Sequence, residues 1–273
     1  MTRSVVHVVS CLLLGLTVAC RLAPVQPALA QATGSPSPVI AHLTPSYATG
    51  FPNTESPISE GGNWINGKTI GVDWTDVQTT TGKAFGTQSG NDANPFNDST
   101  ALLTGSWASD QAAQATVYVS STPTRCCAEV ELRLRSTMTA HNAGGYEFLC
   151  STASSNPYMA IMVWPGALQA NLEDYPQLAY RGDIGCVDGD VLAATAVGST
   201  LTFFKNGDTV LTATDTTFPD GAPGVGLFLH NQSTGVIGSV VANLTGMSAS
   251  YGFTNFAASG SRDLPGADTR SSR

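Results

Sequence analysis

The sequence predicts an all-β protein built as an antiparallel sandwich of two sheets, and three observations favour this fold class. Only 12% of the 273 residues are charged, while Gly, Ser, Thr and Val are abundant, which is a composition typical of β-sheets. Short runs of β-branched and aromatic residues recur between turn residues, and no segment shows a capped helical period. The dipeptide Asn206-Gly207 separates two such runs, and it is the strongest short signal for a hairpin.

The expected strands are short and are joined by turns, with no helical crossover between them, which favours an antiparallel arrangement. In chain order they cover residues 113–119, 128–135, 146–150, 159–164, 191–197, 201–205, 209–213, 225–230, 236–243 and 252–257. Their alternation predicts a core between the sheets that includes Val130, Leu132, Leu134, Val191, Leu201 and Val225.

The two ends of the chain are expected to lie outside this domain. Arg3 followed by an apolar run over residues 5–19 is typical of a secretion signal, and Ala28-Leu29-Ala30 fits its cleavage site. A lipid-modified Cys20 is the alternative. The predicted organisation is a signal peptide at 1–30, a linker at 31–46, the β-sandwich at 47–258 and a disordered tail at 259–273. The mature chain is expected to begin at Gln31 and to be secreted, either extracellular or periplasmic.

The cysteines that remain after this cleavage are expected to form structural disulfides, because the chain is exported and their number is even. They are Cys126, Cys127, Cys150 and Cys186. Of the three pairings, we favour the two that join one of the adjacent cysteines to Cys150 and the other to Cys186, because a bond between adjacent cysteines needs a strained ring. A metal site is disfavoured because no second Cys-x-x-Cys and no suitably spaced His is present.

Net charge excludes some partners. Twenty acidic and twelve basic residues give a formal charge of −8, which argues against a surface that binds nucleic acid. No run is as long as the ~18 apolar residues of a membrane-spanning helix. We expect a monomer that does not span a membrane.

The C-terminal half resembles a known superfamily. Residues 188–208, with Gly189-Asp190 and Asn206-Gly207, resemble the hairpin pair of concanavalin A-like lectin/glucanase (laminin G-like) domains, and residues 218–228 and 251–256 are similar to later strands of that fold. The resemblance implies a jelly roll whose concave sheet can hold a glycan. It is more specific for fold than for chemistry, because this fold hosts lectins, glycosidases, lyases and inert adhesion modules.

One expected strand carries the candidate chemistry. Residues 128–135 alternate without a break, so four charged side chains should share the face that points away from the core. They are Glu129, Glu131, Arg133 and Arg135. Two carboxylates at i and i+2 lie roughly 6–7 Å apart along a strand, which overlaps the spacing of the acids in glycoside hydrolysis, and the arginines could bind an acidic sugar. The alternative is a solvated face of weak ion pairs, with Glu147 as the cross-strand partner.

Other candidate site residues come from the neighbouring segments. Tyr146 is expected to form an aromatic wall beside the charged strand, and Trp164 and Trp74 are expected to be exposed for stacking on sugar rings. His141 lies in the turn after the charged strand and is a third catalytic candidate. No cofactor is required by the sequence, but Asp188 and Asp190 in a Gly-rich loop leave calcium open as an alternative.

Three classes of function fit these patterns, and no Gly-x-Ser-x-Gly, His-Glu-x-x-His or P-loop motif selects a different one. We favour a secreted, lectin-like protein that recognises an extracellular polysaccharide or other glycan on its concave face. A glycoside hydrolase or polysaccharide lyase that uses Glu129 and Glu131 with Arg133 and Arg135 is the second interpretation. A non-catalytic envelope or adhesion module is the third.

Overall fold

A computed structural model describes residues 46–89, 98–121, 127–167, 175–230 and 247–260. The expected signal peptide, most of the linker, the expected strand at 236–243, Cys126 and the last residues of the expected tail lie outside these ranges. Within them, no helix has the length and apolar character needed to cross a membrane.

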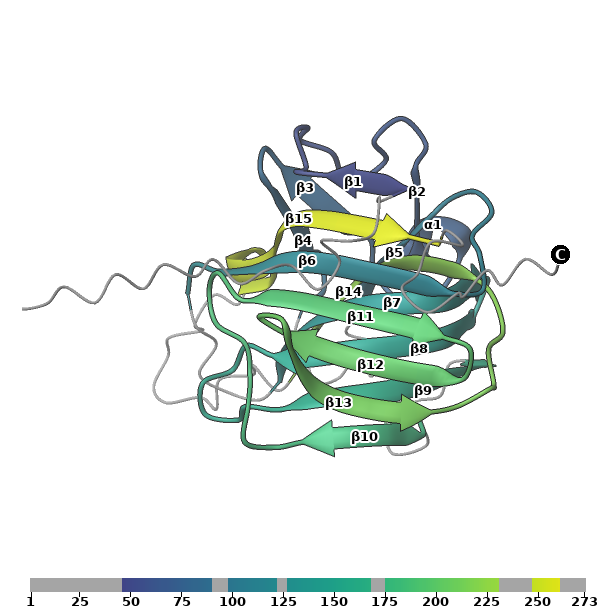
Figure 1. Cartoon of the computed structure of the whole chain (residues 1–273). Helices are drawn as coiled ribbons and strands as arrows, with labels where there is room; N and C mark the ends of the chain where they lie inside the picture. Colours follow the sequence, from purple (N-terminus) through teal and green to yellow (C-terminus); the bar gives the residue numbers. More distant parts are fainter. Residues whose placement is uncertain (1–45, 90–97, 122–126, 168–174, 231–246, 261–273) are drawn as a thin grey trace, which may run out of the picture. The chain divides into compact units, whose positions relative to one another are not determined.

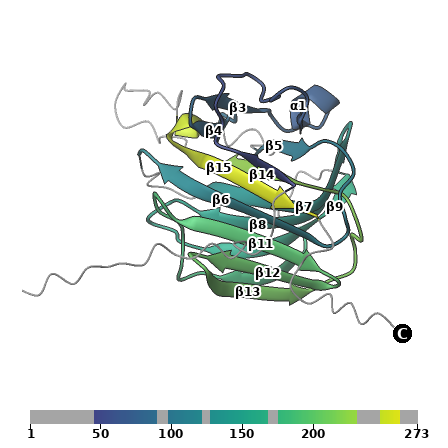
Figure 2. The same cartoon turned by 45° about the horizontal axis from the view of Figure 1, so that its top comes forward.

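The described strands form two antiparallel sheets (Figure 1), which confirms the predicted fold class. Sheet A has eight strands in the order β13-β12-β11-β6-β15-β4-β3, with β1 also paired to β15. Sheet B has seven strands in the order β10-β9-β8-β7-β14-β5-β2. Figure 2 shows β6, β11, β12 and β13 of sheet A as one layer, with β7 and β8 of sheet B in the layer behind.

Each sheet draws on both halves of the chain. The strands of sheet A are β1 (Tyr47–Thr49), β3 (Val77–Thr80), β4 (Lys83–Gly86), β6 (Gln111–Val119), β11 (Val191–Val197), β12 (Thr200–Lys205), β13 (Asp208–Thr214) and β15 (Tyr251–Ser259). The strands of sheet B are β2 (Trp64–Asn66), β5 (Asp98–Leu103), β7 (Ala128–Thr139), β8 (Asn142–Ser151), β9 (Met159–Ala167), β10 (Gln177–Arg181) and β14 (Ala222–Leu229). The helical segments described are short: α1 (Gly67–Ile70) and the 3-10 turn η2 (Met247–Ser250).

The predicted hairpin at Asn206-Gly207 is confirmed. These two residues connect β12 to β13 and have φ values of 53° and 91°. Positive φ at both central residues is the geometry of a type I′ turn, which Asn and Gly adopt with little strain and whose twist matches that of the paired strands.

The hydrophobic core lies between the sheets. Val130, Leu132 and Leu134 of β7 are fully buried there, as alternation predicted, and the expected core residues Leu201 and Val225 are buried with them. Val191 was predicted one residue out of register. It is only half-buried, and Leu192, Ala194 and Ala196 are the residues of β11 that face the core.

The expected disulfide pairing is wrong. Cys150, at the end of β8, bonds to Cys186, with their Cα atoms 5.9 Å apart. The two residues meet because the loop before β11 runs beside the end of β8, where the amide of Cys186 donates to the carbonyl of Ser151 at 2.8 Å. Cys127 is also disulfide-bonded. Structural disulfides in this segment of the chain are therefore confirmed, but Cys150 and Cys186 bond to each other rather than to the two adjacent cysteines.

Candidate functional site

The charged face of β7 is turned away from the core, as predicted, but it is not solvated. Glu129, Glu131 and Arg133 are 7%, 0% and 3% exposed. Trp74 and Trp164 pack together on the outer face of sheet B and cover Arg133, and the hydroxyl of Tyr158 contacts Glu129. The interpretation of this strand as a solvated ladder of ion pairs is therefore wrong.

Arg133 organises a buried ion cluster. Its Nη2 lies 2.7 Å from Oε2 of Glu131 and 2.7 Å from Oε2 of Glu147. Glu147 stands directly opposite Arg133 across the β7–β8 register, so its predicted role as the cross-strand partner is confirmed. The guanidinium also lies over the rings of Trp74 (4.7 Å) and Trp164 (5.6 Å), and the indole N–H of Trp164 donates to Glu147.

A glycine on the adjacent strand leaves the space for this cluster. Gly226 of β14 pairs with Glu131 in the sheet. A Cβ at Gly226 would lie 2.0 Å from Oε2 of Glu131 and 2.8 Å from Nε of Arg133. The two side chains therefore fold across β14 only because residue 226 has no side chain.

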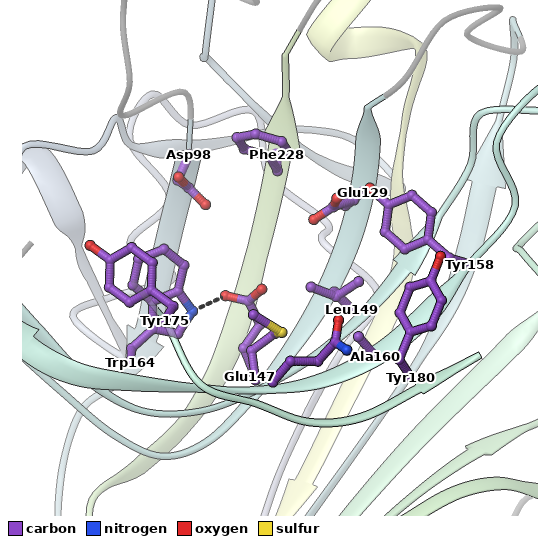
Figure 3. Close-up of a pocket in the computed structure, with 12 residues that line it drawn as sticks. Asp98, Glu129, Glu147, Leu149, Tyr158, Ala160, Trp164, Tyr175, Tyr180 and Phe228 are labelled. Atoms are coloured by element: carbon purple, nitrogen blue, oxygen red, sulfur yellow. Dashed lines mark hydrogen bonds between the residues drawn. The ribbon is translucent and has the colours of Figure 1, made fainter. Parts of the chain in front are cut away.

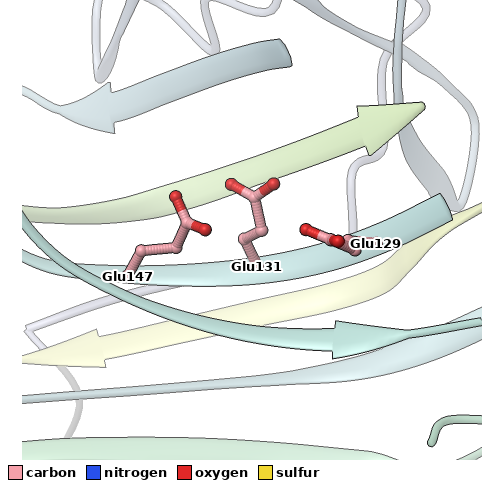
Figure 4. Close-up of side chains that lie close together, drawn as sticks. All are labelled: Glu129, Glu131 and Glu147. Carbon is pink, nitrogen blue, oxygen red and sulfur yellow. The ribbon is translucent and has the colours of Figure 1, made fainter. Parts of the chain in front are cut away.

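The carboxyl groups of this face converge (Figure 4). Glu129, Glu131 and Glu147 each place one oxygen within 4.8 Å of the others. This spacing could hold a metal ion, but the guanidinium of Arg133 already contacts two of the three groups and supplies the positive charge there. The three carboxyl groups therefore do not fit a metal ion while Arg133 is in place.

Burial dominates the titration of these groups. It raises the pKa of Glu129 to about 8, against a lowering hydrogen bond from Tyr158. Burial, with the nearby charge of Glu147, also raises the pKa of Asp98 on β5 to about 8. The pKa values of Glu131 and Glu147 are raised by the same desolvation, which the charge of Arg133 opposes.

A cavity of about 170 Å³ opens beside the cluster (Figure 3). Three carboxyl groups, five aromatic rings and four smaller or flexible side chains line it: Asp98, Glu129 and Glu147; Tyr158, Trp164, Tyr175, Tyr180 and Phe228; Leu149, Ala160, Met162 and Gln177. Tyr180 is 52% exposed and marks the rim. Acids and rings face a common space in Figure 3, which is the arrangement expected of a site for a small polar ligand.

Two predicted ligand-binding residues lie elsewhere. Tyr146 does not form a wall of the site, because it pairs with Leu134 in the sheet and so faces the core, where its hydroxyl donates to Asp215 at 2.7 Å. Arg135 does not face the site because a bulge follows Leu134 and gives Arg135 a φ of 48°. Its guanidinium instead donates to carbonyls of Ser109 and Gly198.

The remaining predicted residues are placed as follows. Trp164 lines the cavity, but it is 6% exposed and Trp74 is 1% exposed, so their predicted exposure is wrong. The exposed ring of His141 at the β7–β8 turn lies 2.9 Å from Asp73 and does not belong to the cavity lining.

The candidate calcium loop is held together by protein groups. Oδ2 of Asp190 lies 2.8 Å from Nζ of Lys205, and its Oδ1 accepts from Asn206. Oδ1 of Asp188 accepts from the amide of Val119. Asp190 therefore forms an ion pair with Lys205.

Sequence reasoning missed Asp98 and Tyr180. The β5 segment reads Asp-Ser-Thr-Ala-Leu-Leu, in which polar and apolar residues do not alternate, and it is buried at every position. Its sequence therefore gives no sign of which face Asp98 takes. Tyr180 sits on β10, a short edge strand next to β9. Only the pairing of these strands brings both residues to the cavity.

The raised pKa values predict how stability depends on pH. Glu129 and Asp98 shift from ordinary values of 4.5 and 3.8 to about 8, so between ~pH 4 and ~pH 8 the folded protein keeps protons that the unfolded chain releases. The free energy of unfolding should therefore fall as pH rises through this window, and Glu129→Gln should flatten the fall. Thermal unfolding across the window measures this. A stability that rises with pH here would contradict the burial of these acids.

No family model matches the chain, and no curated protein is significantly similar to it in sequence. Solved structures similar in fold include the carbohydrate-binding module CBM66 from Bacillus subtilis, with a TM-score of 0.47 and 17% identity over 63% of this chain and 92% of that chain. The metal-free carbohydrate recognition domain of Emp46p has a TM-score of 0.49 and 10% identity over 72% of this chain and 88% of that chain. The exoplasmic/lumenal domain of VIP36, bound to Ca²⁺ and Man3GlcNAc, has a TM-score of 0.47 and 13% identity over 72% of this chain and 83% of that chain.

Proposed function

We propose that the protein binds a carbohydrate in the cavity on the outer face of sheet B. The observation that carries the proposal is the pairing of aromatic rings with carboxyl groups around one space of about 170 Å³. Aromatic faces match the apolar C–H face of a pyranose, and carboxyl groups bind its hydroxyls. The volume suits one sugar unit, and the half-exposed Tyr180 at the rim leaves room for the chain to continue.

A screen against plant and microbial polysaccharides tests the proposal, with retention and released sugar both recorded. Tyr180→Ala should weaken retention about tenfold, because a stacking surface is lost at the rim. Tyr180 is half exposed, so the change should leave thermal unfolding nearly unaltered. Phe204→Ala, which removes a half-buried ring from β12 of sheet A, is the matched control and should bind normally. Equal binding by both variants, or retention of no polysaccharide, would contradict a carbohydrate site here.

Hydrolysis of a glycosidic bond is a second candidate function, favoured by the pair of acids Glu129 and Glu147. They place oxygens within 4.8 Å of each other, near the ~5–5.5 Å separation of carboxyl groups in retaining glycosidases. Glu129, with a pKa of about 8, would hold the proton that the leaving oxygen needs at neutral pH. Hydrolysis is supported if the unchanged protein releases reducing ends and Glu129→Gln abolishes the release while still retaining the polysaccharide. Retention without release by the unchanged protein would remove it.

Nothing in the geometry favours a lyase acting on an acidic sugar. Such a mechanism needs a cation facing the sugar carboxylate. Arg133 is bonded to Glu131 and Glu147, and Arg135 to backbone carbonyls on the other side of the bulge.

We also propose that the protein acts outside the cytosol. The signal expected at 1–30 and the Cys150–Cys186 disulfide support this. The mass of the exported chain tests it, and a mature N-terminus at Gln31 is expected. An acylated Cys20 would contradict that cleavage site but not export, whereas a chain that keeps residues 1–30 and stays in the cytosol would contradict export.

A further inference from the structure

We propose that the cavity binds a sugar carrying a protonated primary amine, as in a glucosamine unit of a deacetylated polysaccharide. This inference rests on the proposed function and specifies its ligand. The sequence favoured the opposite charge, since its exposed arginines suggested an acidic sugar. The structure reverses the expectation, because the arginines are used within the protein while the acids line the cavity.

The charge of the site is the first argument. Asp98, Glu129 and Glu147 line the cavity, and its described lining contains no Lys, Arg or His. Arg133 lies beneath, with Nη2 committed to Glu131 and Glu147. One guanidinium therefore serves four carboxyl groups, and buried carboxylates without a cation are costly. A ligand ammonium would supply positive charge that the protein does not.

Unused acceptor oxygens are the second argument. Asp98 is 3% exposed, and among the described residues none donates a hydrogen bond to its carboxyl group. Arg133 and Trp164 both donate to Oε2 of Glu147, and Tyr158 donates to Oε1 of Glu129. Among the described residues, each lining acid therefore has at least one oxygen without a side-chain donor, and Figure 3 shows these acids around the common space. An ammonium has three donors and no acceptor, and it matches such a set.

The rings are the third argument, and they separate an amino sugar from a bare metal ion. The ring centroids of Trp164 and Tyr175 lie 4.1 Å apart. The rings of Tyr158 and Tyr180 are stacked, with centroids 6.1 Å apart. Aromatic faces attract organic cations and also pack on pyranose rings. A hydrated metal ion would contact the acids and would make no use of these aromatic faces.

Proton release is a specific consequence. Glu129 and Asp98 have raised pKa values of about 8 and hold protons near neutral pH. The titratable and charged groups around them, among the described residues, are Glu131 and Arg133 on β7, Glu147 on β8, Tyr158 before β9, Tyr180 on β10 and Tyr251 on β15. Only Arg133 among these is cationic, so an entering ammonium should displace a proton. A neutral sugar should displace none.

Calorimetry of the exported chain tests the proposal, with glucosamine oligomers, their N-acetylated forms and glucose oligomers as probes. The glucosamine oligomer should bind about tenfold more tightly than the other two. The titration is run at about pH 5.5, where an amine of pKa ~7–8 is fully protonated and Glu129 and Asp98 still hold their protons. In two buffers of different ionisation enthalpy, it should show proton release for the glucosamine oligomer only. Asp98→Asn should remove most of the preference, whereas Asp208→Asn, the same change at an exposed position on β13, should not.

The acidic protein attracts any polycation, so an oligolysine of equal charge is the competitor. Failure of oligolysine to displace the glucosamine oligomer supports the proposal, and full displacement overturns it. Binding of glucose oligomers that Tyr180→Ala weakens, with no preference for the amine, overturns this inference and leaves the proposed function standing. Binding of no oligosaccharide by the unchanged protein overturns both.

Discussion

Replacement of Arg133 by alanine is expected to lower the free energy of unfolding by about 3–5 kcal/mol, because it strands buried carboxylates. Glu131 and Glu147 each lie 2.7 Å from Nη2 of Arg133 and are 0% and 2% exposed. Glu131 has no exposed surface, and Glu147 can meet water only in the cavity that it lines. Urea unfolding monitored by fluorescence measures the change.

Two variants show whether the stranded charge causes this loss. Arg181→Ala removes an arginine whose partner, Asp183, is exposed, and it should unfold close to the unchanged protein. Adding Glu131→Gln to Arg133→Ala removes one stranded carboxylate and should recover part of the stability. An Arg133→Ala protein as stable as the Arg181→Ala protein would mean that water reaches the cluster.

Gly226→Ala is expected to cost about 1–3 kcal/mol through overpacking and to abolish ligand binding. The added Cβ would lie 2.0 Å from Glu131 Oε2, so Glu131 and Arg133 must shift, and Glu147 beside the cavity must shift with them. Gly226 is not among the positive-φ residues, so the substitution tests space rather than backbone strain. Urea unfolding and the polysaccharide retention assay measure the two effects.

Gly50→Ala is the matched control for that change. No atom lies within 4 Å of a Cβ at Gly50, and Gly50 also lacks positive φ. It should bind and unfold normally. If Gly226→Ala retained polysaccharide as well as Gly50→Ala does, the ion cluster would not be needed to position the acids of the cavity.

The sheet elements with clear local patterns were predictable. Alternation in β7 placed Val130, Leu132 and Leu134 in the core and Glu131 on the other face, and Asn206-Gly207 identified a hairpin. These features depend on neighbours in sequence, through the two-residue period of a strand and the φ values of a turn.

The covering of the site was not predictable from the same patterns. Alternation predicts which face of a strand a side chain takes, but not what packs on that face. Arg133 is covered by Trp74, which lies 59 residues earlier in the sequence. The bulge that turns Arg135 away leaves no mark in an unbroken charged run. The partner of Cys150 likewise depends on a loop that approaches β8 only in the folded protein.

A sugar bound in the cavity should lie beside Trp164. The indole N–H resonances of the protein test this most directly. The chain has four tryptophans. Trp164 donates to Glu147 at the cavity, while Trp64 and Trp107 donate to Tyr47 and to the carbonyl of Thr104. With Trp164→Phe to assign the signals, titration of an oligosaccharide taken from a retained polysaccharide should shift the Trp164 resonance and leave those of Trp64 and Trp107 in place. A saturating titration that shifts Trp64 or Trp107 but not Trp164 would contradict the account.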